Sequence, residues 1–92
     1  MRVRVRAFAR FGEILGKEQD VEIEEGWSVK DLLDHLIRLH PRLQEELYDE
    51  QGELRDHVNI MRNRRHIEAY NGLLTEVSDG DEIAIFPPVA GG

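Results

Sequence analysis

Residues 27–41 of the chain read Trp-Ser-Val-Lys-Asp-Leu-Leu-Asp-His-Leu-Ile-Arg-Leu-His-Pro, and this stretch decides the fold. Ser28 is a residue type that caps helix N-termini, and Asp31 three residues later completes a capping box, so we predict a helix that begins at Val29. Pro41 stops the helix, because proline lacks a backbone N–H and clashes with the preceding turn. Apolar side chains recur at the helical spacing and predict one buried stripe, formed by Val29, Leu32, Leu33, Leu36 and Ile37.

The segments before this helix alternate between apolar and charged residues, which is typical of half-buried strands. In residues 1–7 apolar residues alternate with three arginines, and in residues 20–24 Val21 and Ile23 alternate with acids. We predict an antiparallel hairpin, because opposite charges across neighbouring strands are favourable and help to set the register. The alternative is that these charged residues only face solvent and do not pair across the strands. Residues 12–16 between the two strands are predicted to form a turn region.

Beyond the helix, we predict a short helical piece, a polar loop, a strand, a basic turn, an irregular stretch, a tight turn and a last strand. In order these cover residues 43–48, 49–53, 58–61, 63–66, 67–77, 79–81 and 82–86. The element order predicts an α+β fold in which one main helix packs on one face of a mixed sheet of four to five strands. If the first and last strands lie side by side in the middle, the arrangement is the β-grasp (ubiquitin-like) roll.

The length of 92 residues fits one domain, which we divide into a globular part, residues 1–86, and a flexible, extended tail, residues 87–92. The 12 basic and 19 acidic residues give a net charge of −7, which argues against nucleic acids and anionic membranes as partners. No stretch approaches the roughly 20 apolar residues that span a bilayer, so we expect a cytoplasmic protein. The chain has no cysteine, so any sulfur chemistry must use sulfur that a partner brings.

The C-terminal segment Phe86-Pro87-Pro88-Val89-Ala90-Gly91-Gly92 carries the sharpest functional signal. Two prolines favour an extended path and two glycines lack side chains, so the segment can enter a narrow channel in another protein. A carboxylate is a poor electrophile, so chemistry at Gly92 requires activation, for example by an ATP-dependent enzyme that forms an acyl-adenylate. A frayed end without function is the alternative, since short motifs often match by chance.

Two longer segments carry a family resemblance, Leu54-Arg55-Asp56-His57-Val58-Asn59-Ile60-Met61-Arg62-Asn63 and Asp79-Gly80-Asp81-Glu82-Ile83-Ala84-Ile85-Phe86 with the tail that follows it. They resemble the molybdopterin synthase small subunit and, more closely, the small archaeal ubiquitin-like modifiers. The resemblance covers nearly the whole chain and is most specific in the Gly-Asp-Glu strand that leads to Pro-Pro and Gly-Gly. The thiamine-pathway sulfur carriers, which lack much of residues 41–56, resemble the chain less.

This resemblance implies a sulfur carrier. An E1-like adenylating enzyme would activate Gly92 with ATP, and sulfur would displace the adenylate to give a terminal thiocarboxylate. In molybdopterin synthase the tail inserts into the large subunit and donates the sulfur for molybdenum cofactor biosynthesis. In the archaeal modifiers the activated Gly92 is instead joined to lysines of target proteins by isopeptide bonds. Under both hypotheses the chain binds no cofactor and is not an enzyme. A third hypothesis is a non-conjugating interaction domain whose tail stays idle.

Two aromatic residues predict a docking patch beside the tail. Phe8 continues the outward phase of the N-terminal arginines and Phe86 that of Ala84, so alternation places both rings on the outer face of the sheet. A bulge that turns them inward is the alternative. Neighbouring exposed aromatic side chains favour a binding surface, and the resembling families dock through this face. With Gly92 as the reacting residue, the predicted partner-binding residues are Phe8, Phe86, Pro87, Pro88, Val89, Ala90 and Gly91.

The remaining polar clusters give weaker signals. His35 and His40 are five residues apart on the predicted helix and point in different directions, so no metal site is predicted. Arg62, Arg64 and Arg65 form the only basic cluster in the sequence. We interpret this cluster as a solvated turn, with an acidic partner surface or the phosphate of a pterin as the alternatives.

Overall fold

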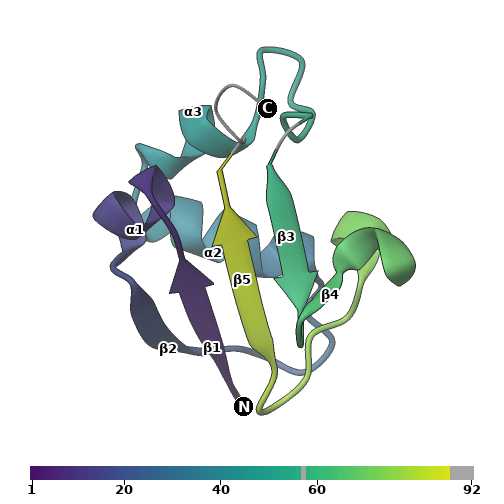
Figure 1. Ribbon diagram of the computed structural model, residues 1–92. Coiled ribbons are helices and arrows are strands. Elements are labelled where there is room, and N and C mark those ends of the chain that lie inside the picture. The colour runs from purple at the N-terminus through teal and green to yellow at the C-terminus, as the bar shows by residue number, and fades with distance from the viewer. Residues whose placement is uncertain (57, 88–92) are drawn as a thin grey trace.

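The computed structural model describes residues 1–56 and 58–87, which build a five-stranded mixed sheet in the order β2-β1-β5-β3-β4 (Figure 1). The strands β1 and β5 lie side by side and run parallel, whereas every other neighbouring pair is antiparallel. The first and last strands therefore occupy the middle of the sheet, as predicted. The strands are β1 (Arg2–Ala7), β2 (Glu18–Glu22), β3 (Asn59–Arg62), β4 (Arg65–His66) and β5 (Glu82–Phe86).

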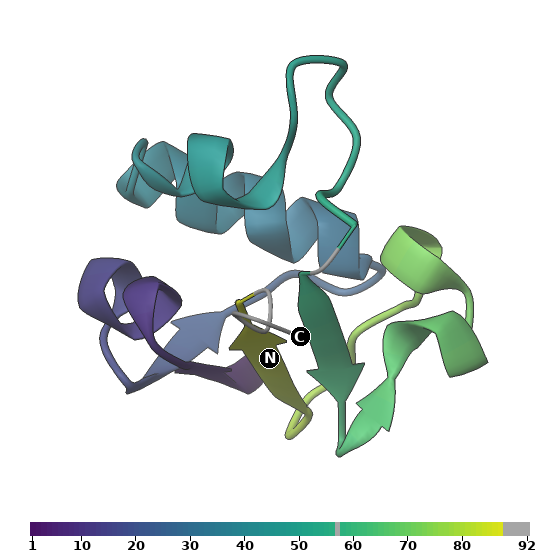
Figure 2. The same cartoon turned by 45° about the horizontal axis from the view of Figure 1, so that its top comes forward.

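The helices lie over one face of this sheet and along its edges, and no helix of the described residues covers the opposite face (Figures 1 and 2). This layering and strand order confirm the β-grasp roll. The α-helices are α1 (Arg10–Leu15), α2 (Val29–Leu39) and α3 (Leu43–Leu47), and the short 3₁₀ helices are η1 (Ile67–Ala69) and η2 (Gly72–Leu74). In the described part of the chain, none of these helices has both the length and the apolar character that crossing a bilayer requires.

The helix α2 begins and packs as its sequence predicts. The Ser28 hydroxyl accepts a hydrogen bond from the Asp31 backbone N–H at 3.2 Å, and the Asp31 carboxylate accepts one from the Ser28 N–H at 2.9 Å. The two residues thus satisfy backbone donors at the helix start that would otherwise lack partners. Four members of the predicted stripe are fully buried, namely Val29, Leu32, Leu33 and Leu36, while Ile37 is only partly buried. Each buried aliphatic side chain contributes about 1.5–3 kcal/mol of burial free energy.

The charged residues of β1 and β2 face one another in the predicted antiparallel hairpin. Cross-strand neighbours are Arg2 with Glu22, Arg4 with Asp20, and Arg6 with Glu18. The N···O distances of these three ion pairs run from 2.9 to 3.9 Å. Exposed pairs of this kind contribute little stability, so their main effect is on register. The predicted second strand was placed two residues too late, because β2 begins at Glu18 and ends at Glu22.

Residues 12–16, which the sequence predicts as a turn region, belong mostly to the helix α1. Phe11 and Leu15 lie on one side of this single-turn helix and are both buried in the core. Gly12 permits the close packing of α1 on β1, since a Cβ atom at this position would lie only 2.9 Å from the Ala7 carbonyl oxygen. The turn prediction was wrong because no side chain caps this helix, so the sequence contains no start signal.

Residues 63–66 were predicted as a turn, but only Asn63 and Arg64 form one. Arg65 and His66 form β4, which makes a hairpin with β3. Asn63 and Arg64 both have positive φ, 51° and 69°, which matches a two-residue turn whose twist fits antiparallel strands. Met61 then pairs with His66, and Arg62 with Arg65. The prediction missed β4 because Arg64 stands where the usual turn signal has glycine. The predicted irregular stretch, residues 67–77, contains the two 3₁₀ helices.

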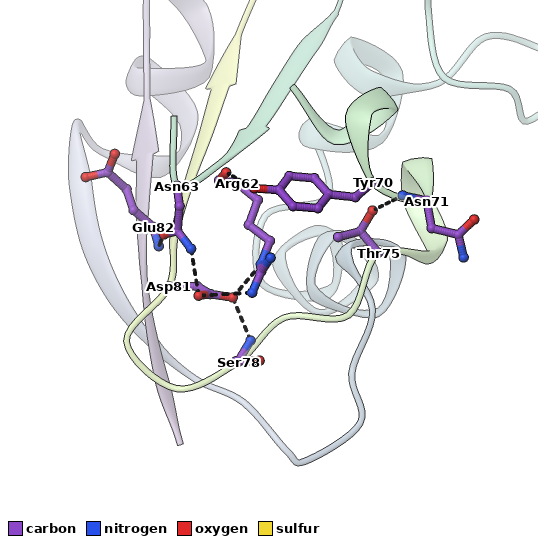
Figure 3. A network of polar contacts seen from close by, with 8 residues as sticks. All are labelled: Arg62, Asn63, Tyr70, Asn71, Thr75, Ser78, Asp81 and Glu82. Carbon is purple, nitrogen blue, oxygen red and sulfur yellow. Dashed lines mark hydrogen bonds and ion pairs between the residues drawn. The ribbon is translucent and has the colours of Figure 1, made fainter. Parts of the chain in front are cut away.

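A buried carboxylate ties this hairpin to the turn before β5 (Figure 3). Asp81 is 6% exposed and accepts hydrogen bonds from Arg62 Nε at 2.8 Å, Asn63 Nδ2 at 2.9 Å and the Ser78 N–H at 2.7 Å. The Tyr70 ring packs on the same guanidinium, 5.1 Å from its central carbon. Arg62 is therefore half-buried and its charge is paired with Asp81, so its assignment to a solvated basic cluster was wrong.

These contacts also set the protonation of Asp81. Burial works against ionisation, but the hydrogen bonds from Arg62, Asn63 and Ser78 outweigh it and hold the pKa of Asp81 below its ordinary value. In the unfolded chain an aspartate titrates at about 3.9. The ionised carboxylate therefore stabilises the fold above about pH 4, and this stabilisation is lost as the pH falls through the lower pKa of the folded state.

We expect Asp81→Asn to lower the free energy of unfolding by about 1–3 kcal/mol at neutral pH, because it removes a charged acceptor from three donors. The difference from the wild type should begin to narrow below about pH 4 and close as the pH falls through the lower pKa of the folded state, where the wild-type carboxylate is also protonated. Urea unfolding at neutral and acidic pH measures both values, with Glu25→Gln as a control at an exposed carboxylate. An equal difference at both pH values would show that Asp81 acts through packing rather than charge.

Candidate functional site

The rings of Phe8 and Phe86 stack on each other at one end of the sheet. Because β1 and β5 are parallel neighbours, both strands end at the same edge, and the Phe8 N–H continues the ladder by donating to the Ile85 carbonyl at 3.1 Å. The ring centroids lie 4.4 Å apart with an interplanar angle of 4°. Both side chains are half-buried. The predicted proximity of these two residues is confirmed, and it takes the form of direct contact.

The backbone changes direction sharply at Ala9, directly after Phe8, and the Phe8 ring stays outside the core. Ala9 has φ 52° and ψ −129°, a backbone conformation that is unfavourable for a residue with a Cβ atom. The Phe8 carbonyl accepts the Phe11 N–H at 3.1 Å, which starts the helix α1 directly after the strand. Phe11 consequently turns into the core, where it is fully buried, while Phe8 stays on the outer face beside Phe86.

Other side chains extend this surface along the outer face of the sheet. Cross-strand neighbours share a face, and the register pairs Arg6 with Ala84 and Ala84 with Met61. Ala84 is 7% exposed, so its larger neighbours cover it. We call the surface formed by Phe8, Phe86, Arg6, Ala84 and Met61 the aromatic platform. Sequence reasoning missed Met61, although alternation along β3 could have placed it on this face.

Arg6 gives the aromatic platform its one charged member. The guanidinium carbon lies 5.4 Å from the Phe8 ring centroid, and such a cation–π contact contributes about 0.5–1 kcal/mol at an exposed site. Two carboxylates, those of Glu18 and Glu82, each lie 3.9 Å from guanidinium nitrogens of Arg6. The surface is therefore an apolar stack with a partly compensated cation at its side. Rigid aromatic rings of this kind are common anchors in protein interfaces.

The described chain ends beside this platform. Pro87 follows Phe86 directly and is half-buried, and because proline has no N–H it cannot extend the hydrogen-bond ladder of β5. The other predicted tail residues, Pro88, Val89, Ala90, Gly91 and Gly92, lie outside the described residues. Their roles, and the predicted boundary between residues 86 and 87, therefore stay predictions.

The histidines have neighbours of other kinds. The His35 ring lies 5.4 Å from the Trp27 ring, and His66 Nε2 lies 3.0 Å from Asn59 Oδ1. His57 lies outside the described residues. Within residues 1–56 and 58–87, no three His, Asp or Glu side chains gather into a group that could hold a metal ion.

Comparison with known proteins places this geometry in a family. The model of a family described as the ThiS family matches residues 5–92, which include both rings of the platform and the whole tail. The chain belongs to the ThiS family. The matched part also contains residues 41–56, which the thiamine-pathway carriers largely lack in the resemblance considered above.

This ThiS-family chain is 36% identical over 93 residues to small archaeal modifier protein 3 of Haloferax volcanii, with 100% of both chains covered. It is 31% identical to the molybdopterin synthase sulfur carrier subunit of Chlamydomonas reinhardtii, again over 100% of both. The crystal structure of SAMP1 from Haloferax volcanii matches with a TM-score of 0.86 and 34% identity, covering all of both chains. The resemblance found in the sequence is confirmed: the chain is a member of a family of ubiquitin-like sulfur carriers and modifiers.

The stacked geometry predicts energetic coupling between the two rings of this ThiS-family protein. We expect a double-mutant cycle with Phe8→Leu and Phe86→Leu to give a coupling free energy of about 0.5–1.5 kcal/mol, since each substitution removes the same ring contact. Urea unfolding of the four chains measures this coupling. The cycle of Phe8→Leu with Leu74→Ala is the control, because Leu74 is 69% exposed and belongs to η2, so these changes should be additive. Additive effects of Phe8→Leu and Phe86→Leu would contradict the stack.

Proposed function

We propose that this ThiS-family protein is a ubiquitin-like sulfur carrier that an E1-like enzyme activates with ATP at Gly92. The observation that supports this proposal most is the aromatic platform at the end of β5, next to the point where the chain continues into the Pro-Pro and Gly-Gly segment. A partner that binds the aromatic platform would hold the body of the carrier in a fixed position. The partner's active site would then bind the C-terminal segment and react with it. Fixed docking of this kind converts a search by a free chain end into a positioned reaction.

The proposed chemistry has two steps at the Gly92 carboxylate. The carboxylate oxygen attacks the α-phosphorus of ATP, which releases pyrophosphate and gives an acyl-adenylate. A hydrosulfide ion supplied by a partner then attacks the acyl carbon, a C–S bond forms, the C–O bond to AMP breaks, and the products are AMP, the thiocarboxylate and one proton that passes to water. The chain contains no cysteine, so both the sulfur and its donor come from other proteins.

The carrier itself contributes recognition rather than catalysis. In the described part of the chain, the platform offers aromatic rings, a methyl group, a thioether and one guanidinium, none of which exchanges protons readily near neutral pH. We infer that the thiocarboxylate is delivered to molybdopterin synthesis, with the large subunit of molybdopterin synthase as the acceptor. The support for this acceptor is the relative from Chlamydomonas reinhardtii, whose name is molybdopterin synthase sulfur carrier subunit.

A second candidate function is protein modification. The support for this candidate is the 36% identical relative from Haloferax volcanii, whose name is small archaeal modifier protein 3. Conjugation would begin with the same adenylate and end with an amide bond to a target lysine. The two candidates share the activation step and can both apply to one chain. An interaction domain with an idle tail is the third reading, and the experiment below distinguishes it.

We expect the chain, incubated with its activating enzyme, ATP and a sulfur source, to gain the mass difference between sulfur and oxygen at its C-terminal peptide. Intact and peptide mass spectrometry measures this exchange. The control is a chain that lacks Gly91 and Gly92, which should keep its own mass because its terminal carboxylate, now on Ala90, ends two residues short of the activated position.

Three outcomes of this experiment have distinct meanings. An unchanged mass with an activating enzyme that adenylates other carriers under the same conditions would contradict sulfur carriage. A Gly-Gly remnant on lysines of other proteins, without a thiocarboxylate, would favour the modifier. The shortened chain could also bind its partners as tightly as the intact chain, while the intact chain forms no covalent product. That result would favour an interaction domain whose tail has no function.

The platform also predicts how the activating enzyme is bound. We expect Phe8→Ala to weaken that binding by about tenfold or more, because loss of a central aromatic anchor typically costs over 1 kcal/mol. Isothermal titration calorimetry with the intact carrier measures the dissociation constant. Leu74→Ala is a matched control, since it removes an exposed apolar side chain from η2. If both variants bind like the wild type while remaining folded in urea titrations, the platform is not the docking surface.

A further inference from the structure

Lys17 and Lys30 are the only lysines in the chain, whose other ten basic side chains are arginines. An isopeptide bond requires an uncharged amine, so arginine cannot act as the acceptor and the choice on this chain is narrow. The structure gives the two lysines very different surroundings. This contrast allows one of them to be singled out as a modification site.

The Lys30 ammonium is engaged with its neighbours. Its Nζ lies 3.3 and 3.1 Å from the two carboxylate oxygens of Asp34, one helical turn along α2, and 6.0 Å from the Tyr48 ring centroid. The hydrogen bond to Asp34 raises the pKa of Lys30, although partial burial opposes this. The nucleophilic, uncharged form of this amine is therefore less populated, and the bond to Asp34 must break before attack.

Lys17 combines a fixed backbone with an exposed side chain. Its carbonyl accepts the Ala7 N–H at 3.1 Å, which continues the β1–β2 ladder by one residue beyond the last strand pair. Its side chain is exposed, and no ion pair or side-chain hydrogen bond of Lys17 is found among the described residues. The backbone thus presents this amine from a defined place, and no carboxylate among residues 1–56 and 58–87 pairs with its ammonium group.

The position of Lys17 also places it near the C-terminal end of β5. Ile85 pairs with Ala7, and Ala7 is hydrogen-bonded to Lys17, so the three residues form one row across the sheet. Two strand spacings separate the ends of this row, about 10 Å. Seven residues follow Ile85, where this row ends, and seven residues can span at most about 24 Å by covalent geometry. The acyl carbon of Gly92 is therefore within covalent reach of the Lys17 amine of the same chain.

We propose that Lys17 is the amine on this protein that accepts an activated C-terminal glycyl group. The inference rests on the proposed function, because it needs Gly92 as an acyl-adenylate or a thioester. The Lys17 Nζ lone pair attacks the acyl carbon and a C–N bond forms. The bond to AMP or to the thiol breaks, and the amine proton passes to water. The acyl group comes from the same chain or from a second copy, and a short connection favours the same chain through its high effective concentration.

The test uses the full chain with Gly92 converted chemically to a thioester, so that no activating enzyme is needed. We expect most of the amide product to form at Lys17, and Lys17→Arg to lower the total amide yield about tenfold through loss of the favoured amine. Lys30→Arg should leave the yield unchanged. Peptide mass spectrometry locates the bond. A product one water lighter than the free chain indicates attack within one molecule, and a dimer indicates attack between two copies.

A second variant tests the physical reason for the choice. Asp34→Asn should raise the share of product at Lys30 about twofold, since it removes one i,i+4 ion pair and leaves Lys17 untouched. Glu25→Gln is the matched control, because it removes the same charge from an exposed side chain. Product located mainly at Lys30 or at the Met1 amine, or an unchanged yield in Lys17→Arg, would overturn the proposal. The proposed function is tested independently of this experiment, and it is contradicted if the activating enzyme and ATP never modify Gly92.

Discussion

The parallel pairing of β1 with β5 is the constraint on which the rest of the structure depends. Parallel neighbours need a long crossover connection, and here all remaining elements lie between the two strands in the sequence. Because both strands run the same way, they end at the same edge of the sheet. That edge brings Phe8 and Phe86 into stacking contact, although they are 78 positions apart in the chain.

The two faces of the sheet are specialised by this arrangement. The amphipathic helix α2 covers one face with a fully buried stripe, which gives the domain its core. The opposite face keeps ordered charges on β1 and β2 and an apolar stack beside the end of β5. A carrier or modifier needs such a division, because its body must be stable alone while one surface remains available to successive partners. The family relationship and the geometry therefore support the same functional class.

Buried and exposed charges have different effects in this molecule. The arginines of β1 face acids across the strand at exposed positions, where water and salt weaken each pair. Asp81 and Arg62 are largely removed from water, and their hydrogen bonds join two turns that are distant in the sequence. The exposed pairs thus help to set the register of the β1–β2 hairpin. The pair of Asp81 and Arg62 fixes the position of the β3–β4 hairpin relative to the turn before β5. This difference explains why one arginine of the basic cluster is structural while Arg64 and Arg65 remain exposed.

The sequence by itself determined the elements whose signals are local. The capping box and Pro41 bound the main helix, alternation defines the central strands, and the tail and the strand before it reveal the family. The outward phase of Phe8 and Phe86 follows from the two-residue period of strands. Only the tertiary structure decided the stack between these rings, the single-turn helix α1, the strand β4 and the partner of Arg62. Each of these depends on contacts between distant residues, and such contacts can stabilise a conformation for which the local sequence carries no signal.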